Sequence, residues 1–405
     1  MKKPWILAVS VAVCAGTVAV AQTGTAAGPK RGPERGRVVS SERIARLSAD
    51  ETAAYLSGQH YPSPAPRNGV DAYRIGYRTV DENGGPTTAS GLLVLPRNAD
   101  RHPRLVAYEH GTMAAREDGP SVDDNDARAS TVLFAGRGYA AVAPDLLGLG
   151  TGPGHHPYMD AATEASASLD MLRAARNFAA GHGRTLDGRV LVTGFSAGGH
   201  AAMAVGRTLQ DHADRHFALA AVAPVSGPFD VEHAEIPAAL RDDTLDPKEA
   251  VFYLGYWITS MNRLHHLYDS PSEAFLPPYD DTAESLFDGD HSDEEVFRGL
   301  PDTVDQLLTP RFRRQLLHPT GALRRAMREN DTTCSDWTPE VPVRLYAADG
   351  DRDVAIANSE HCRAQLAANG VAAPLTDVGD VGHFDSPVLS MPRIAEWFEQ
   401  LRPAR

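Results

Sequence analysis

The chain has 405 residues, 42% of them hydrophobic, and carries a formal net charge of −14 at pH 7. This acidity argues against nucleic acid or an anionic membrane as the main partner, because both favour clustered Lys and Arg. The composition is that of a soluble acidic protein, and the length exceeds that of one minimal domain.

Residues 1–21 have the three parts of a secretory signal peptide. Two lysines precede an apolar run over residues 5–15, and residues 19–21 (Ala-Val-Ala) form an A-x-A cleavage site. Cleavage near Ala21 would remove the two lysines and no acidic residue, which leaves a net charge of −16. We therefore expect a protein secreted to the extracellular space or the periplasm, with no stable membrane anchor after cleavage.

Two alternative interpretations exist for residues 1–21. A lipoprotein would carry its lipid on Cys14, but the bulky Val13 precedes it where a small residue is needed. A membrane anchor would need an uninterrupted apolar run of about 18 residues. The run near the N-terminus is shorter than that, and no other run of that length occurs in the sequence.

Strand and helix signals alternate after residues 22–37, which are rich in Gly, Pro, Thr and Arg and read as a disordered leader. Alternating runs at 73–80 and 89–95 flank a turn and predict a hairpin at the sheet edge. Four further strands are expected at 105–109, 140–143, 190–193 and 219–224, separated by helical runs near 126–136, 160–180 and 199–212. This rhythm predicts an α/β fold with a mainly parallel sheet and helices on both faces.

The rhythm breaks over residues 232–337, and a strand at 341–347 then resumes the sheet. An insertion there would form a helical cap over the carboxyl edge of the strands, with the core made of residues 38–231 and 338–405. The cap carries an aromatic cluster. Its members, with one aromatic residue of the core, would line an acyl pocket or else serve only as hydrophobic core: Tyr253, Tyr256, Trp257 and Phe195.

The stretch G-F-S-A-G at 194–198 lies where a buried strand turns into a helix. Residues 189–193 are rich in β-branched side chains, and residues 199–209 have the spacing of a helix. A strand that turns straight into a helix through G-x-S-x-G forms a nucleophile elbow, in which a strained serine presents its hydroxyl above the sheet. Ser196 is therefore the predicted nucleophile.

A serine nucleophile needs a base and an acid that orients the base. Asp351 directly follows the strand at 343–347 and is the predicted acid, with Asp349 and Asp353 in the same loop as alternatives. His383 comes about 30 residues later, before the last predicted helix at 393–401, and is the predicted base. The order serine, acid, histidine is the one that this fold uses.

The oxyanion of the reaction needs two amide donors. One comes from the residue after the nucleophile, here Ala197. The other should come from the loop after the strand at 105–109, where Gly111 lets the backbone turn its amides toward a substrate carbonyl. The amide of Thr112 is the predicted second donor.

Two cysteines remain after processing, Cys334 and Cys362. An oxidising compartment makes one disulfide between them the natural expectation, with two free buried thiols as the alternative. No metal or cofactor is expected. Four acids, starting at Asp349, match positions 1, 3, 5 and 12 of a calcium loop, but position 6 is Val354 where that loop needs glycine.

Several motifs in this order resemble the secretory lipase family of α/β-hydrolases: His110-Gly111-Thr112, residues 138–150, His156-Pro157-Tyr158, residues 194–201 and Asp351-Arg352-Asp353-Val354. The similarity runs from about Tyr73 to the C-terminus. It implies an α/β-hydrolase fold with a helical lid inserted before the acid-bearing strand. It also implies a secreted serine carboxylic-ester hydrolase without a metal, acting on small-molecule or lipid esters.

The chain departs from this family at three places. Leu146 stands where relatives commonly have tyrosine, Ala197 where many have glutamine, and Ala347-Ala348 where they have a His-Gly pair. These changes do not touch the triad but alter the pocket, so the acyl-chain preference of relatives is not carried over. A serine peptidase of the same fold and a non-catalytic binding module are the alternative functions.

Overall fold

The computed structural model describes residues 34–62, 66–242 and 244–401. The expected signal peptide and residues 22–33 of the expected leader lie outside this part. The last residues of that leader are described, and they contact the core. Arg35 donates from Nε to Oδ2 of Asp170 at 2.8 Å, so the folded part begins a few residues before the boundary expected at residue 38.

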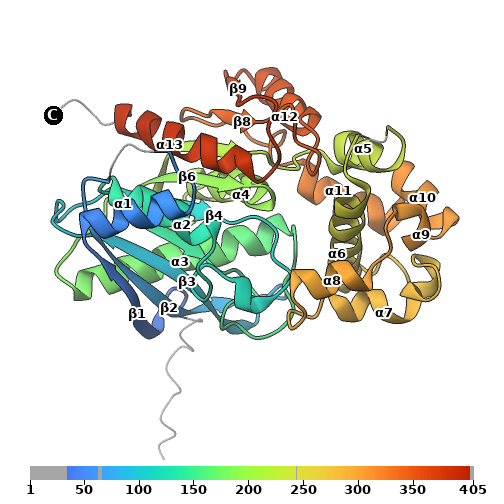
Figure 1. Cartoon of the computed structure of the whole chain (residues 1–405), viewed down its shortest axis with the longest axis horizontal. Helices are drawn as coiled ribbons and strands as arrows, with labels where there is room; N and C mark the ends of the chain where they lie inside the picture. Colours follow the sequence, from blue (N-terminus) through green and yellow to red (C-terminus); the bar gives the residue numbers. More distant parts are fainter. Residues whose placement is uncertain (1–33, 63–65, 243, 402–405) are drawn as a thin grey trace, which may run out of the picture. The chain divides into compact units, whose positions relative to one another are not determined.

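The described residues contain one nine-stranded sheet, with strand order β1-β2-β3-β5-β4-β6-β7-β8-β9 (Figure 1). Strands β1, β2, β3 and β5 pair in antiparallel fashion, and all pairs from β5 to β9 are parallel. The expected mainly parallel sheet is confirmed. Its strands are β1 (Val38–Leu47), β2 (Val70–Val80), β3 (Pro86–Pro96), β4 (Leu105–Glu109), β5 (Ala140–Pro144), β6 (Arg189–Phe195), β7 (Ala218–Val225), β8 (Leu345–Ala347) and β9 (Leu375–Asp377).

The expected hairpin is the β2–β3 pair, but its placement at the sheet edge is wrong. Strand β1 pairs with β2 over residues from Val38 to Leu47 and forms the edge instead. All of its residues are exposed or only partly buried. An edge strand of this kind has no strong hydrophobic alternation, so the sequence pattern did not reveal it.

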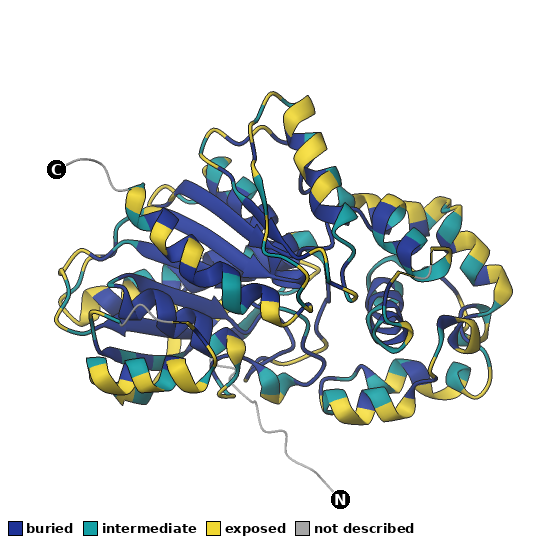
Figure 2. Cartoon of the chain, turned by 45° about the horizontal axis from the view of Figure 1, so that its top comes forward, coloured by how far each residue is buried: buried dark blue, intermediate teal, exposed yellow. Residues whose placement is uncertain are grey.

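Helices cover both faces of the sheet, as expected. On one face α1, α2 and α13 share a hydrophobic cluster with Leu191, and on the other face α3, α4 and α12 share a cluster with Val190 and Val192. Adjacent residues of a strand point to opposite faces, which explains this division. Figure 2 shows the buried sheet between its helices. The core helices are α1 (Ala49–Gly58), α2 (Asp126–Gly136), α3 (Ala161–Gly181), α4 (Ala197–Gln210), α12 (Ala357–Ala368) and α13 (Asp385–Gln400).

The segment between β7 and β8 forms a helical cap with a hydrophobic cluster of its own. The cluster includes Trp257, and it also takes in Tyr158 and Ala197 from the core, so the cap packs directly against the core. The cap helices lie together on one side of the core (Figure 1). They are α5 (Ile236–Leu240), α6 (Pro247–His265), α7 (Tyr279–Leu286), α8 (Asp293–Gly299), α9 (Val304–Leu307), α10 (Pro310–Leu317) and α11 (Gly321–Asp331).

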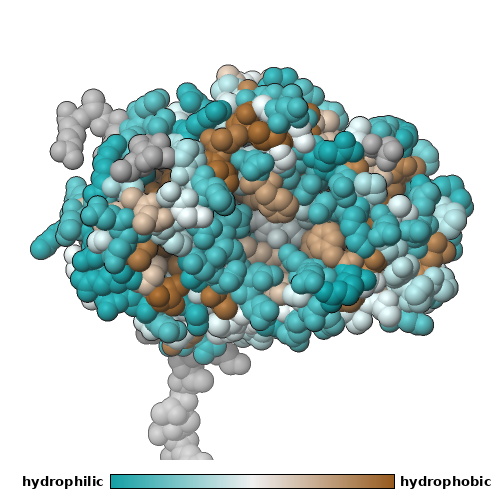
Figure 3. All heavy atoms as spheres, in the orientation of Figure 1, coloured by the Kyte–Doolittle hydropathy of each residue, from teal (hydrophilic) through white to brown (hydrophobic). Residues whose placement is uncertain are grey.

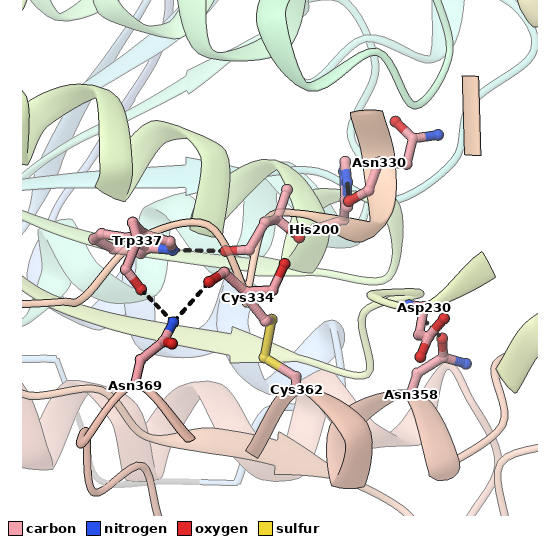
Figure 4. The surroundings of a disulfide bond; sticks show 10 residues. His200, Asp230, Asn330, Cys334, Trp337, Asn358, Cys362 and Asn369 are labelled. Atoms are coloured by element: carbon pink, nitrogen blue, oxygen red, sulfur yellow. Dashed lines mark hydrogen bonds between the residues drawn. A yellow bond between two sulfur atoms is a disulfide. The ribbon is translucent and has the colours of Figure 1, made fainter. Parts of the chain in front are cut away.

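A disulfide joins Cys334, which follows the last cap helix, to Cys362 in α12 (Figure 4). Both residues are fully buried. Asn369 adds two hydrogen bonds from Nδ2, to the carbonyl oxygens of Ser335 at 2.7 Å and Trp337 at 3.0 Å. The chain that returns from the cap to β8 is thus held to α12 by one covalent bond and two hydrogen bonds. The expected disulfide is confirmed.

The face of the molecule seen in Figure 3 is mainly hydrophilic. On the face seen in Figure 3, hydrophobic residues gather near the middle, between hydrophilic residues of the core and the cap. Within the part of the chain that the structure describes, no helix has the length and apolar character needed to cross a bilayer.

Candidate active site

Ser196 lies at a sharp turn between β6 and α4. Its backbone has φ 57° and ψ −127°, a strained conformation for a residue with a side chain. The turn can pack closely against the neighbouring backbone because it contains glycines, which have no side chain. A Cβ on Gly198 would lie 2.1 Å from the carbonyl oxygen of Glu109, and a Cβ on Gly194 would lie 2.1 Å from that of Gly198. The stretch G-F-S-A-G therefore adopts the geometry of a nucleophile elbow.

Three side chains from distant segments meet at this turn. Nε2 of His383 lies 2.9 Å from Oγ of Ser196, and its Nδ1 lies 2.7 Å from Oδ2 of Asp351. The three residues are 3 to 8% exposed. With its proton on Nδ1, the imidazole donates to the carboxylate and accepts from the serine hydroxyl. A hydroxyl held in this way can lose its proton to the ring as it attacks a carbonyl.

The loop after β8 brings only one of its three candidate acids to His383. Asp351 accepts hydrogen bonds at Oδ1 from the amides of Asp353 and Val354, both at 2.9 Å, and presents Oδ2 to the imidazole. Asp353 instead accepts a hydrogen bond from the hydroxyl of Tyr253 at 3.2 Å. Asp349 is exposed to solvent. The geometry therefore agrees with Asp351 as the predicted acid.

The two expected oxyanion donors belong to segments that touch at the elbow. Ala197 is the first residue of α4, and the amides of a helix's first turn have no partner within the helix. The loop of Thr112 lies against the elbow, since a Cβ on Gly111 would be 3.2 Å from the ring of Phe195. The side chain of Thr112 is held by a hydrogen bond between Oγ1 and the hydroxyl of Tyr158 at 2.7 Å.

A cavity of about 50 Å³ opens beside Ser196, between the acid loop and the cap. Of the four aromatic residues expected to bind substrate, Tyr253 and Trp257 line it. Both come from α6, which also contributes Ala250 and Leu254. These positions are spaced as i, i+3, i+4 and i+7 and so share one face of the helix. This spacing is a sequence signal that separates the cavity-lining residues from their neighbours.

The structure does not bring Phe195 or Tyr256 to the lining of this cavity. Phe195 is buried under the elbow, with its ring centroid 4.6 Å from that of His383. Tyr256 lies on another face of α6, stacks on Tyr158 at 4.3 Å between ring centroids, and donates its hydroxyl to the carbonyl oxygen of Met113 at 3.2 Å. Both therefore support the walls of the site without lining the cavity.

Sequence reasoning did not single out two polar residues of this cavity, Tyr158 and Glu235. Tyr158 had a signal in the His-Pro-Tyr motif, but the motif gave no position for its hydroxyl. Glu235 had none. Burial raises the pKa of Glu235 to about 8; hydrogen bonds from Asn358 and the amide of Ala355 lower it, and repulsion from nearby aspartates raises it.

No family model matches the chain. No curated protein matches it either. Solved structures do match. A ligand-bound form of the rice cell wall degrading esterase LipA from Xanthomonas oryzae is 26% identical, with a TM-score of 0.81, over 91% of this chain and 100% of that chain. A putative hydrolase from Legionella pneumophila is 25% identical, with a TM-score of 0.83, over 91% of this chain and 100% of that chain.

The chain has the α/β-hydrolase fold, and the solved structures that it resembles include an esterase. Candida antarctica lipase A shares the fold at greater distance, with 15% identity and a TM-score of 0.64 over 92% of this chain and 84% of that chain. The expected α/β-hydrolase fold and the resemblance to lipases are confirmed.

Two groups of side chains in the described part of this α/β-hydrolase could offer ligands to a metal ion, and neither includes a residue of the elbow. One joins Asp160, His265 and Glu329; the other joins Asp230, His233 and Asp331. In the second group, Asp230 already accepts hydrogen bonds from His233 at 3.0 Å and from His361 at 2.8 Å. The carboxylate of Asp230 therefore already has hydrogen-bond partners within the protein.

Proposed function

We propose that the protein is a serine carboxylic-ester hydrolase with Ser196 as nucleophile, His383 as base and Asp351 as the acid that orients it. The observation that carries this proposal is the continuous chain of contacts from Oδ2 of Asp351 through the imidazole to Oγ of Ser196, at 2.7 and 2.9 Å. Similarity to solved esterases favours esters as the substrates over the peptides of the alternative function.

The first half of the reaction forms an acyl-enzyme. Oγ of Ser196 attacks the ester carbonyl while Nε2 of His383 takes its proton, and the carboxylate of Asp351 stabilises the resulting imidazolium. The amides of Ala197 and Thr112 receive the oxyanion, and the positive end of α4 adds to their effect. When the carbonyl re-forms, the bond to the alcohol breaks and His383 returns the proton to the alcohol.

The second half releases the acid. A water molecule gives its proton to His383 and attacks the acyl carbon, and the same amides receive the second oxyanion. As the bond to Ser196 breaks, His383 returns the proton to Oγ. The protein needs no other group for either half.

Secretion belongs to the same proposal. The N-terminal 21 residues have the pattern of a signal peptide, and the Cys334–Cys362 disulfide fits an oxidising compartment such as the extracellular space or the periplasm. The substrate would then be an ester met outside the cytoplasm.

The variant Ser196→Ala tests the nucleophile. We expect it to fold as the wild type does by circular dichroism and to lose at least about a thousandfold in the turnover of p-nitrophenyl butyrate. Ser260→Ala removes a buried cap hydroxyl outside the cavity lining and is the matched control. A fluorophosphonate probe should label the wild type and the control but not Ser196→Ala. Equal turnover by the two variants would refute the proposal.

A further inference from the structure

The cavity beside Ser196 is small. Its volume of about 50 Å³ leaves room for about four water-sized groups. Leucine side chains of the cap, at Leu245 and Leu254, and Val354 of the acid loop form apolar parts of its wall. A group that fills this space without reaching into solvent is therefore short.

One residue of the cavity lining, Trp257, has a hydrogen-bond donor without a partner in the described part of the chain. Trp257 is 4% exposed, and its Nε1 is buried without a hydrogen-bond partner among the described residues. The indole N–H can only donate, and buried tryptophans normally place this group against an acceptor. An acceptor atom in the cavity that came within reach of Nε1 would supply the missing partner.

A second polar group on the wall also has capacity left. Glu235 accepts at Oε2 from Nδ2 of Asn358 at 2.6 Å and from the amide of Ala355 at 3.4 Å. No contact is seen for its Oε1 within the described part of the chain. Because burial raises the pKa of this carboxyl to about 8, most of it is protonated at pH 7, and the free oxygen can then exchange hydrogen bonds with a hydroxyl or donate to a carbonyl.

The hydroxyls of the two wall tyrosines and one oxygen of the wall carboxylate Asp353 already have partners. The hydroxyl of Tyr253 donates to Asp353 at 3.2 Å, and the hydroxyl of Tyr158 shares a hydrogen bond with Thr112 at 2.7 Å. Among the polar residues of the lining, Trp257 supplies an unpartnered donor and Glu235 a carboxyl oxygen without a hydrogen bond to the described residues, and our inference uses these two.

Resting on the proposed function, we propose that this cavity receives a short acyl group that carries an oxygen of its own, so that the preferred substrates are esters of short hydroxy or keto acids. Trp257 donates to that oxygen, and Glu235 forms a second hydrogen bond with it. The acyl group is the occupant because it stays bonded to Ser196 until water releases it, whereas the alcohol has to leave before water enters.

A matched pair of substrates tests this inference. Methyl 3-hydroxybutanoate and methyl 3-methylbutanoate differ by a hydroxyl in place of a methyl group, and their hydrolysis can be followed by titration of the released acid. We expect the wild type to favour the hydroxy ester by about tenfold in kcat/KM, as one or two neutral hydrogen bonds would give. Methyl octanoate should be hydrolysed at least tenfold less efficiently than methyl butanoate.

The variant Trp257→Phe removes the N–H and keeps an aromatic ring. We expect it to bring the ratio of the two kcat/KM values close to one. Trp337→Phe is the control, because Trp337 is also buried but already donates from Nε1 to the carbonyl oxygen of Thr333 at 2.6 Å and does not line the cavity. It should keep the wild-type ratio.

The experiment distinguishes failure of the proposed function from failure of this inference. If neither ester is hydrolysed, the proposed function fails and this inference falls with it. If both esters are hydrolysed equally, or if Trp257→Phe keeps the tenfold ratio, the inference is overturned while the ester hydrolase stands. A preference for 2-hydroxypropyl acetate over isobutyl acetate, without one in the acyl pair, would place the polar contact on the alcohol and also overturn it.

Discussion

His383 and Asp351 are 32 positions apart in the chain, yet Nδ1 of the ring lies 2.7 Å from Oδ2 of the carboxylate. Both side chains are 1% exposed, so the pair is screened from water. The other carboxylate oxygen is held by two amides, which fixes the direction of the one that faces the ring. Asp351 is thus rigid where an acid that orients a base must be rigid.

This geometry predicts the effect of Asp351→Asn. The amide of asparagine would donate to Nδ1 and so favour the ring proton on Nε2, where it blocks acceptance from Ser196. We expect turnover of p-nitrophenyl butyrate to fall at least about a thousandfold. Asp353→Asn is the matched control, and we expect a loss of less than about tenfold. Similar losses in both variants would contradict the assignment of Asp351.

Glu109 leads to a prediction about stability and pH. Its carboxyl is completely buried at the end of β4, and this burial raises its pKa to about 8 from the usual value near 4.5. A hydrogen bond from Ser168 at 2.7 Å lowers the pKa, and repulsion from Glu164 raises it. Between about pH 4.5 and 8 the folded state holds a proton that the unfolded state has lost, so the free energy of unfolding falls as the pH rises through this range.

Replacing the carboxyl by a neutral amide should remove this loss. We expect Glu109→Gln to gain stability over the wild type by on the order of a few kcal/mol on going from pH 5 to pH 9. Urea unfolding at pH 5 and at pH 9 measures the free energy of unfolding of each variant. Glu396→Gln, at an exposed position of α13, is the control and should change the free energy of unfolding by the same amount at both pH values. A Glu109 variant whose advantage does not grow with pH would show that this carboxyl is already ionised in the folded protein.

How much the sequence could predict depended on how local each feature is. The elbow was predictable because its strand, its glycines and its helix are contiguous around Ser196. The base and the acid were predictable because each follows a recognisable strand in the order that the fold requires. Asp351 could not be separated from its neighbours with certainty, since only the folded loop shows that Asp353 contacts Tyr253.

Features that depend on long-range packing could not be predicted. Glu235 reaches the cavity only because the cap folds back beside the acid loop. Tyr256 and Trp257 are adjacent in sequence but face different sides of α6, and aromatic composition alone does not separate them. The last helix was expected from residue 393, whereas α13 begins at Asp385, because Pro392 within the helix obscured its first half.

The elbow also predicts which glycine substitution the site cannot accept. A Cβ at Gly198 would lie 2.1 Å from the carbonyl oxygen of Glu109 and 2.4 Å from that of His110, and both of these atoms belong to the backbone that carries the oxyanion loop. Neither can move without displacing the amide of Thr112. We therefore expect Gly198→Ala to lower turnover of p-nitrophenyl butyrate at least about a hundredfold, because removing a single oxyanion donor costs this much.

Gly58, the last residue of α1, provides the control, since a Cβ there would meet nothing within 4 Å. Gly58→Ala should keep turnover within about twofold of the wild type. Thermal unfolding of both variants separates the two ways in which Gly198→Ala can act: a lowered Tm means that the contact strains the whole fold, and an unchanged Tm means that only the oxyanion loop has moved. Full activity with an unchanged Tm would show that the close approach of these backbones is not required.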